Sequence, residues 1–406
     1  MKVIVNLQPL LAPLTGVGHY TREITRELVR RQSTEASFQL ESLHGIAGTH
    51  IDSLHASYPL LAEKVSSNAH GDTAVSARAV SRRHSAWRFA RRYLRNPVTR
   101  ALYRQALTQR LRLHTWRHPS LRNAIYWEPN FVSLPWSGRS VVTVHDLSHM
   151  RYPEFHPRER VDFFAQGLPQ SLARASRIHV VSRFTADELQ SLFDIDPARI
   201  DIVPPGVSER FYAVEPAQRE RVRQRHALPA RYCLSVGTLE PRKNLTTLID
   251  AFLSLPTARQ HACPLVLVGM PGWGAQRLST AAQRALEDGR LRRLGYVDDD
   301  ELPALYANAT LFAYVSRYEG FGMPVIEAMA AGTPVITADA TATREVAGDA
   351  ALTVPPDDIG AIRDALDTLM NDPDQADRLR RAGYQRARMF SWPRSTDALL
   401  ESFRLV

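Results

Sequence analysis

Two positively charged side chains stand together in a short segment at residues 237–244. The segment follows an apolar run at residues 232–236 and precedes a helical pattern of apolar residues. A turn between a strand and a helix leaves backbone N–H groups free, and these groups and the helix dipole attract anions. Arg242 and Lys243 add two charges at this point, and Lys243 is one of only three lysines. The sequence therefore predicts an anion site, with two solvated loop charges as the alternative.

Two carboxylates, Glu319 and Glu327, lie eight residues apart in a second segment that also follows an apolar run. Gly320 and Gly322 between them would let the backbone approach a ligand closely. Pro324 suits the first turn of a helix, which would place Glu327 about one turn further on. Carboxylates accept hydrogen bonds from hydroxyl groups, so the pair suits a sugar or a ribose. The alternative is a solvated glutamate followed by one that interacts with the helix dipole.

The first half of the chain holds candidate residues after two other apolar runs. Gly16 and Gly18 follow the first run and open a helical pattern, where a Gly-x-Gly sequence permits close contact between backbone and ligand. His145 and Asp146 end the apolar run that begins at Val141. Open parallel sheets bind ligands beyond the carboxyl ends of their strands. His145 is therefore a candidate for the same cleft as the charged segments.

These candidates depend on a framework in which short apolar runs alternate with helical patterns. Nearly continuous Val, Ile and Leu runs are typical of parallel strands that are covered on both faces. The alternation predicts an α/β protein with open parallel sheets. We predict strands at residues 3–7, 124–127, 141–145, 178–181, 200–203, 232–236, 265–268, 311–315, 335–337 and 352–354.

The alternation breaks once, at residues 203–207. Two prolines and a glycine follow a strand there, and a polar stretch at 215–225 precedes the next strand. A chain of 406 residues is long for one core and suits two domains. We predict domains at 1–207 and 208–390, followed by a C-terminal helix at 391–406.

The net charge of +9, from 51 Lys and Arg against 42 Asp and Glu, is concentrated in one region. Residues 73–127 contain thirteen arginines and no acidic residue, so the remainder is slightly acidic. We predict a basic helical insert at about 78–122, which favours an anionic membrane surface or an anionic acceptor. A solvated face stays open as an alternative. Nucleic acid is not expected, because no recognised module accompanies the charge. The candidates for anionic contact are Arg88, Arg91, Arg92 and Arg95.

The composition indicates a globular protein and argues against a membrane-spanning one. Apolar residues make up 44% and charged residues 23%, an ordinary globular mixture, and no apolar run is long enough to span a membrane. The N-terminus does not resemble a signal peptide. Cys233 and Cys263 have no metal-ligand spacing, and the Asp-x-Asp at residues 194–196 precedes a proline and reads as a turn. We expect a cytoplasmic protein without a metal, with a peripheral location at the inner face of the cytoplasmic membrane as a further hypothesis.

The two charged segments together resemble the retaining glycosyltransferases of family 4. The family's Glu-x7-Glu pattern corresponds to Glu319 and Glu327, and its Gly-x-x-x-x-Arg-Lys turn corresponds to Gly237, Arg242 and Lys243. The resemblance covers nearly the whole chain and is weakest in the basic region. It implies a GT-B fold, in which two doubly wound Rossmann-like domains face a cleft and the C-terminal helix crosses back onto the first domain.

The resemblance also implies roles for the candidates. Arg242 and Lys243 would neutralise the donor diphosphate, whose negative charge grows as the glycosidic bond breaks. Glu327 would hold the ribose hydroxyls, and Glu319 would contact the donor sugar. His145 would lie beside the donor sugar and the acceptor. The other positions expected at the donor are Gly16, Gly18, Gly237, Val297, Gly320, Phe321, Gly322 and Met323.

The amino-acid sequence of residues 237–244 resembles the corresponding segment of bacterial mannosyltransferases of surface-polysaccharide assembly. GDP-mannose is therefore the first choice of donor, with UDP-glucose, a rhamnose donor and an N-acetylhexosamine donor left open. The acceptor would be a hydroxyl of a lipid-linked glycan or an oligosaccharide, and no cofactor is expected besides this nucleotide-sugar substrate. Two other functions remain as alternatives: a GT-B sugar-nucleotide epimerase, and a non-catalytic protein that binds an anionic membrane or polymer. The sequence does not indicate an oligomeric state.

Overall fold

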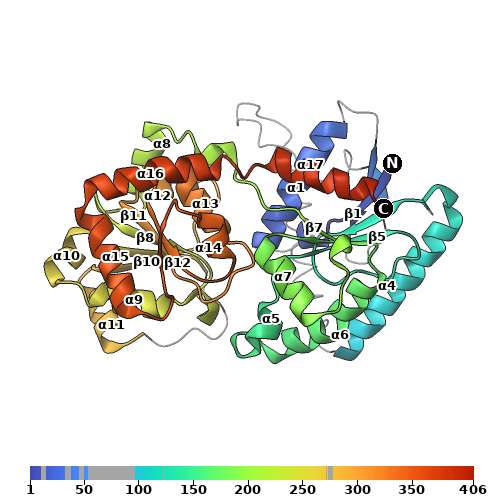
Figure 1. Cartoon of the computed structure of the whole chain (residues 1–406), viewed down its shortest axis with the longest axis horizontal. Helices are drawn as coiled ribbons and strands as arrows, with labels where there is room; N and C mark the ends of the chain where they lie inside the picture. The colour runs from blue at the N-terminus through green and yellow to red at the C-terminus, as the bar shows by residue number, and fades with distance from the viewer. Residues whose placement is uncertain are drawn as a thin grey trace.

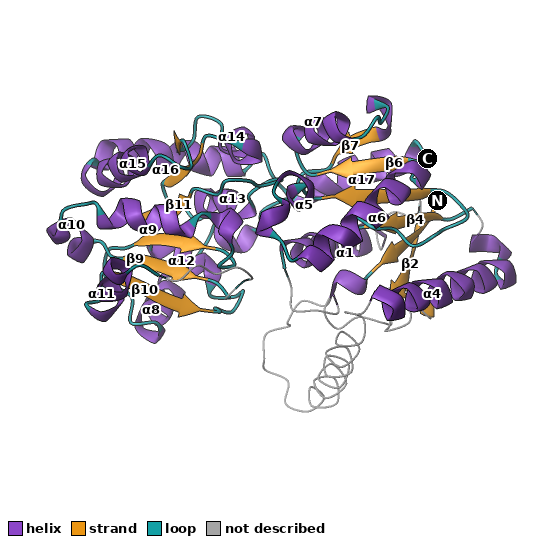
Figure 2. Cartoon of the chain, turned by 90° about the horizontal axis from the view of Figure 1, so that it is seen from below, coloured by secondary structure: helices purple, strands orange, loops and turns teal. Residues whose placement is uncertain are grey.

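The computed structural model describes residues 1–10, 15–32, 38–44, 50–53, 97–121, 123–270, 272 and 278–406. The chain forms two α/β halves, each built on one sheet (Figure 1). Helices cover both faces of each sheet (Figure 2). Four of the basic candidates, Arg88, Arg91, Arg92 and Arg95, lie outside the described residues, so their contact with an anionic partner stays a prediction.

The first half contains a seven-stranded sheet in the order β3-β2-β1-β4-β5-β6-β7. All described pairs are parallel except β2 and β3, which are antiparallel. The predicted strands include neither β2 nor β3, and this edge pair departs from the parallel order of the rest of the sheet. The connection between β2 and β3 is too short for the crossover that parallel neighbours need. The strands are β1 (Lys2–Asn6), β2 (Gln39–His44), β3 (His50–Ser53), β4 (Ile125–Glu128), β5 (Ser140–Val144), β6 (Arg177–Val180) and β7 (Ile200–Ile202).

Five helices lie among the described residues of the first half. In α1, Tyr20, Ile24 and Leu28 are fully buried at helical spacing. Ser182 caps α7, because its hydroxyl accepts a hydrogen bond from the Thr185 N–H. The helices are α1 (Gly16–Gln32), α4 (Pro97–Arg117), α5 (Ser148–Arg151), α6 (Arg158–Arg174) and α7 (Arg183–Leu192).

The second half contains a six-stranded, wholly parallel sheet in the order β10-β9-β8-β11-β12-β13. Its strands are β8 (Cys233–Val236), β9 (Leu265–Val268), β10 (Leu291–Gly295), β11 (Leu311–Tyr314), β12 (Val335–Ala338) and β13 (Leu352–Val354). Its helices are α8 (Pro216–Arg225), α9 (Leu245–Leu253), α10 (Thr257–Ala262), α11 (Thr280–Glu287), α12 (Leu302–Asn308), α13 (Met323–Ala330), α14 (Thr341–Ala347), α15 (Ile359–Asn371) and α16 (Pro373–Ala387).

Two elements of the second half have no apolar signal in the sequence. The edge strand β10 carries Arg292 and Arg293, which are not fully buried, so no continuous apolar run marks it. Helix α8 lies in the polar stretch at 215–225 and buries only Val222. Both elements show that partial burial at an edge weakens the periodicity on which a sequence prediction depends.

The chain ends in α17 (Trp392–Arg404), which leaves the second half and packs against α1 of the first (Figure 1). The Ser402 hydroxyl lies 2.8 Å from Nε2 of the buried His179 and donates to Asp201 at 2.5 Å. Gly206 makes this packing possible, because a Cβ there would overlap the backbone of Trp392. The C-terminal helix thus connects the two halves a second time.

The carboxyl-terminal ends of the two sheets face each other. The backbone of His145, directly after β5, is in close contact with Gly320, which follows β11. The candidate residues of both halves therefore converge on one boundary, as the predicted α/β GT-B arrangement of two Rossmann-like domains requires.

Candidate active site

The cationic segment leaves β8 at its carboxyl end and enters α9 through a 3-10 turn at Pro241–Lys243. Asn244 adopts a left-handed backbone (φ 57°) between turn and helix. Its amide donates to the carbonyls of Val315 (3.1 Å) and Pro356 (2.6 Å). These two bonds fasten the turn to the segment after β11 and fix where Arg242 and Lys243 project.

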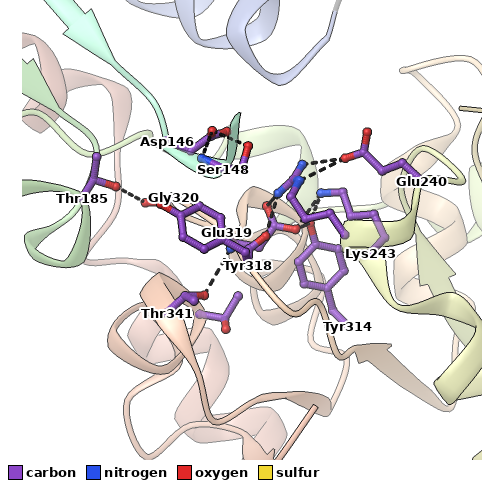
Figure 3. Close-up of polar contacts among 12 residues, drawn as sticks. Asp146, Ser148, Thr185, Glu240, Lys243, Tyr314, Tyr318, Glu319, Gly320 and Thr341 are labelled. Atoms are coloured by element: carbon purple, nitrogen blue, oxygen red, sulfur yellow. Dashed lines mark hydrogen bonds and ion pairs between the residues drawn. The ribbon is translucent and has the colours of Figure 1, made fainter. Parts of the chain in front are cut away.

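Both cations contact Glu319, and Figure 3 shows the contact of Lys243. Arg242 Nη1 lies 2.7 Å from Oε2 of Glu319, and Lys243 Nζ lies 2.7 Å from Oε1. Lys243 also donates to the Tyr314 hydroxyl at 2.6 Å, and this hydroxyl donates to Oε1 of Glu319 at 2.8 Å. Arg242 further donates to the carbonyl of Tyr318 at 2.7 Å. The structure therefore brings three of the four predicted catalytic residues into one hydrogen-bonded cluster.

Burial and charge act in opposite directions on this cluster. Burial would raise the pKa of Glu319, but Arg242 and Lys243 outweigh it and hold that pKa at about 2. Burial and the neighbouring Arg242 lower the pKa of Lys243. The pKa of Arg242 is raised well above its usual value, because Glu319 and Asp146 outweigh the effect of burial. Glu319 and Arg242 thus stay charged over the whole physiological range.

Two further carboxylates surround Arg242. Glu240 is buried and accepts from Arg242 Nη2 at 2.7 Å. Asp146 comes from the other half, and its pKa is about 2, because the charge of Arg242 and hydrogen bonds from Ser148 outweigh burial. The backbone N–H of Ser148 donates to Asp146 at 3.0 Å and its hydroxyl at 2.7 Å. The guanidinium is thus surrounded by carboxylates from both halves of the protein.

Both oxygens of Glu319 have partners within the protein. The resemblance assigns Glu319 to the donor sugar, whereas both of its oxygens contact the two cations here. A diphosphate that bound Arg242 and Lys243 would compete with this carboxylate for the same donors. In this structure the Glu319 carboxylate therefore occupies the position next to Arg242 and Lys243 that is predicted for the diphosphate.

Glu327 has very different surroundings. It lies in the second turn of α13, where the Tyr306 hydroxyl of α12 donates to its Oε2 at 3.0 Å. Burial raises the pKa of Glu327 to about 7, against the smaller opposing effect of the Tyr306 bond. The charge of Arg210 also lowers this pKa, by less than the Tyr306 bond does. The charge of this carboxylate can therefore change near neutral pH.

His145 is held in one orientation at the end of β5. Its Nε2 lies 2.7 Å from the carbonyl of Pro129, which can only accept, so Nε2 carries a proton. Its ring packs edge-on against Tyr20 (5.0 Å) and Phe131 (5.5 Å). Burial lowers its pKa, although the Pro129 bond and the Asp146 charge oppose that shift. The imidazole is therefore neutral at pH 7, with the proton on Nε2.

The predicted donor-binding loops also meet at the boundary. Gly16 is the first residue of α1, where an added Cβ would touch nothing, and Gly18 is buried in the same turn. One turn on, His19 and Arg22 contact Asp299 of the second half at 3.6 and 3.5 Å. Asp299 follows the buried Val297 by two residues, so these contacts bring the start of α1 beside the Val297 loop.

The loop from Gly320 to Met323 makes a sharp entry into α13. Gly322 has φ 95°, which favours glycine, and Met323 begins the helix. Phe321 is buried edge-on against Phe390 at 5.4 Å.

Gly237 contacts Gly269 at the end of β9, so its backbone lies between two strand ends.

Several participants escaped the sequence analysis. Glu240 was not singled out, because it stands next to the more conspicuous Arg242 and Lys243. Tyr314 lies in an ordinary apolar strand, and nothing in the sequence indicates that Tyr306 bonds Glu327. Asp146 adjoins His145, so its position at a strand end was the available clue. Within the residues that the structure describes, no group of three His, Cys, Asp or Glu side chains could hold a metal, and no helix is long and apolar enough to cross a membrane.

The two facing α/β halves and the cluster of Arg242, Lys243 and Glu319 at their boundary indicate a class, the GT-B glycosyltransferases. Two family models match the chain: "Glycosyltransferase Family 4" over residues 14–211 and "Glycosyl transferases group 1" over residues 217–386. The O-antigen chain mannosyltransferase B of Escherichia coli is 33% identical over 407 residues, which cover 100% of both chains. The protein belongs to glycosyltransferase family 4.

Solved structures show the same fold at low sequence identity. Sucrose-phosphate synthase from Thermosynechococcus elongatus matches with a TM-score of 0.67 and 18% identity, covering 100% of this chain and 98% of that one. Anabaena Alr3699/HepE in complex with UDP-glucose also gives a TM-score of 0.67, with 14% identity and 100% coverage of both chains. These likenesses establish the GT-B architecture.

Proposed function

We propose that this glycosyltransferase moves mannose from GDP-mannose, with retention of configuration, to a hydroxyl of a lipid-linked or oligosaccharide acceptor in cell-surface glycan synthesis. The full-length similarity to an O-antigen mannosyltransferase supports the sugar and the pathway class. The observation that carries the chemistry is the pair of mostly buried side chains, Arg242 and Lys243, just beyond the carboxyl end of β8. Domains at 1–207 and 208–390, with a returning helix at 391–406, belong to the same proposal.

The proposed reaction uses the two cations as the stabiliser of the leaving group. Charge builds on the diphosphate as its bond to the sugar breaks, and buried fixed cations stabilise this charge more strongly than water does. No metal is needed for that step. Glu327 would accept hydrogen bonds from the ribose, and Glu319 would pass from the cations to the donor sugar. The acceptor hydroxyl would attack near His145 on the face that the diphosphate leaves.

Purified protein incubated with GDP-mannose, UDP-glucose, a rhamnose donor and an N-acetylhexosamine donor tests the donor. We expect GDP-mannose alone to raise the melting temperature strongly, because bound ligand stabilises the folded state by mass action. Release of GDP that depends on a glycan acceptor would support transfer. Isomerised nucleotide sugar without acceptor would instead indicate the epimerase. No binding of any nucleotide sugar would refute the proposed function.

A peripheral location at an anionic membrane is part of the proposal, and α4 supports it. Leu102, Leu113 and Trp116 lie on one face of this helix and are 60%, 46% and 68% exposed. The helix contains five arginines and no acidic residue, a composition that suits anionic headgroups. Vesicles containing phosphatidylglycerol should bind the protein, and Leu113→Ser with Trp116→Ser should weaken binding about tenfold.

Leu405 offers a matched control, because it is 67% exposed and lies outside α4. Leu405→Ser should leave vesicle binding unchanged. Equal binding to phosphatidylcholine and phosphatidylglycerol vesicles would count against the charge-based membrane hypothesis, since an arginine-rich face distinguishes the two headgroups.

A further inference from the structure

The carbonyl of Gly320 is held by side chains from the other half of the protein. Gly320 follows Glu319 and is buried. Its oxygen lies 2.7 Å from the Ser182 hydroxyl and 3.1 Å from the Thr185 hydroxyl, both at the start of α7 (Figure 3 shows the Thr185 contact). The Gly320 carbonyl thus accepts hydrogen bonds from both hydroxyls across the boundary. Gly320 directly follows Glu319, whose carboxylate contacts Arg242 and Lys243.

The same loop touches the first half at two further points. A Cβ on Gly320 would overlap the carbonyl of His145, so only glycine permits this approach. The hydroxyl of Tyr318 accepts from the Leu147 N–H at 3.2 Å, and its ring packs on Tyr152 at 5.6 Å. The loop that carries Glu319 is therefore seated on the segment after β5 as well as on α7.

The start of α7 is also capped from the second half. Glu345 of α14 accepts from the backbone N–H groups of Arg183 (3.0 Å) and Phe184 (2.9 Å). These N–H groups have no partner within the helix, so an anion there is favoured. Helix α14 begins at Thr341, whose hydroxyl accepts from the Glu319 N–H at 3.2 Å. The start of α7 is thus bound both by the Glu319 loop, through Gly320, and by α14, through Glu345.

We propose that Thr185 and Ser182 are positioning residues for Glu319: the start of α7 holds the Gly320 carbonyl, and the cationic cluster is correctly assembled only when the two halves are docked. Within the second half, the loop carbonyls of Tyr318 and Glu319 are bound by Arg242 and by the Ala342 N–H. The next carbonyl depends on α7. Residues of the first half thereby set the geometry of a donor site built on the second.

Thr185→Val tests this role, because valine keeps the shape and removes the hydroxyl. The Thr185 N–H still donates to Ser182, so the helix cap remains. If the proposed sugar transfer holds, kcat should fall about tenfold while the donor KM stays within about threefold, and Thr185→Ser should restore kcat. A purely structural role would lower the melting temperature without this kinetic split. A valine variant with wild-type kcat, or a serine variant no better than valine, would overturn the proposal.

Gly320→Ala tests the docking without relying on turnover. Spin labels at Glu159→Cys and Asp374→Cys report the distance between the halves, since both positions are exposed and the native Cys233 and Cys263 are buried. Gly320→Ala should lengthen and broaden the distance distribution, and Thr185→Val should broaden it.

Gly360→Ala is the matched control for this measurement, because its added Cβ would meet only an Asp358 oxygen at 3.3 Å and no atom of the first half. An unchanged distribution in Gly320→Ala would refute the docking. If the wild-type protein transfers no sugar, the proposed function fails, and this distance measurement still decides the positioning proposal.

Discussion

The surroundings of Glu319 and Glu327 differ in charge, although the two residues are only eight positions apart in the sequence. Both carboxylates are held in surroundings where burial raises the pKa. Glu319 nevertheless has a pKa of about 2, and Glu327 has a pKa of about 7. The difference arises from the partners: two cations contact Glu319, whereas a neutral tyrosine hydroxyl contacts Glu327.

The difference follows from where each residue leaves the sheet. Glu319 lies in the loop after β11, opposite the turn that follows the neighbouring strand β8, so it meets Arg242 and Lys243. Glu327 lies on α13 and faces α12, which offers Tyr306. One carboxylate is a permanent anion, and the other can gain or lose its charge near neutral pH. A shared sequence motif therefore contains two chemically distinct groups.

The largest effect is expected from Arg242→Met, which leaves Glu319, Glu240 and Asp146 with one nearby cation fewer. Transfer should fall by about 10²–10³-fold, because the leaving diphosphate loses a fixed cation. The free energy of unfolding should fall by about 3–5 kcal/mol, because buried carboxylates lose their partner. Initial rates and urea unfolding measure the two effects.

Adding Glu240→Gln to that variant separates stability from chemistry. The double variant should regain part of the stability, since one uncompensated carboxylate is gone, and none of the activity. Recovery of transfer in the double variant would show that Arg242 supports the fold alone.

Glu319→Gln should have the next largest effect and two opposite consequences. Transfer should fall by about a hundredfold, on the order of one strong electrostatic contact. Binding of free GDP should become several-fold tighter, because the carboxylate no longer competes for Lys243 and Arg242. Calorimetric titration with GDP measures the second effect. Glu327→Gln is the control, and similar tightening in both variants would contradict the competition.

The sequence predicted most of this framework because buried parallel strands leave clear apolar runs. Arg242, Lys243 and Glu319 were identifiable because each lies in the segment that follows such a run, and the two halves follow from the break after Val203. The edge strand β10 was missed, because one side of an edge strand is exposed and its residues need not be apolar.

The partners of the site residues could not be predicted in the same way. The bond between Glu327 and Tyr306 joins neighbouring helices, and the contact between Gly320 and His145 joins two sheets. Such contacts depend on tertiary packing, which a pattern along the chain does not encode. The pairing of Glu319 with both cations likewise needed the order β8-β11 in the sheet.

A smaller effect should appear in the pH dependence of stability. The folded pKa of Glu327, about 7, lies above the usual value of 4.5 for a glutamate, so its protonated form favours folding. The free energy of unfolding should therefore decrease as pH rises from 5 to 8, by at most about 3 kcal/mol. Glu327→Gln should remove this decline, and Glu319→Gln should retain it, since the stabilisation from Glu319 is lost only as pH falls toward 2.

The smallest effect is expected from Tyr306→Phe, which deletes the hydroxyl that donates to Glu327. This bond lowers the Glu327 pKa against the effect of burial, so its loss should move the stability decline upward by roughly half to one pH unit. The phenol itself does not titrate in this range, because burial and Glu327 raise its pKa well above 10. Urea unfolding at several pH values locates the midpoint. A downward shift would mean that the hydroxyl stabilises the protonated carboxyl instead, and the contrast with Glu319 would then lie in protonation as well as in countercharge.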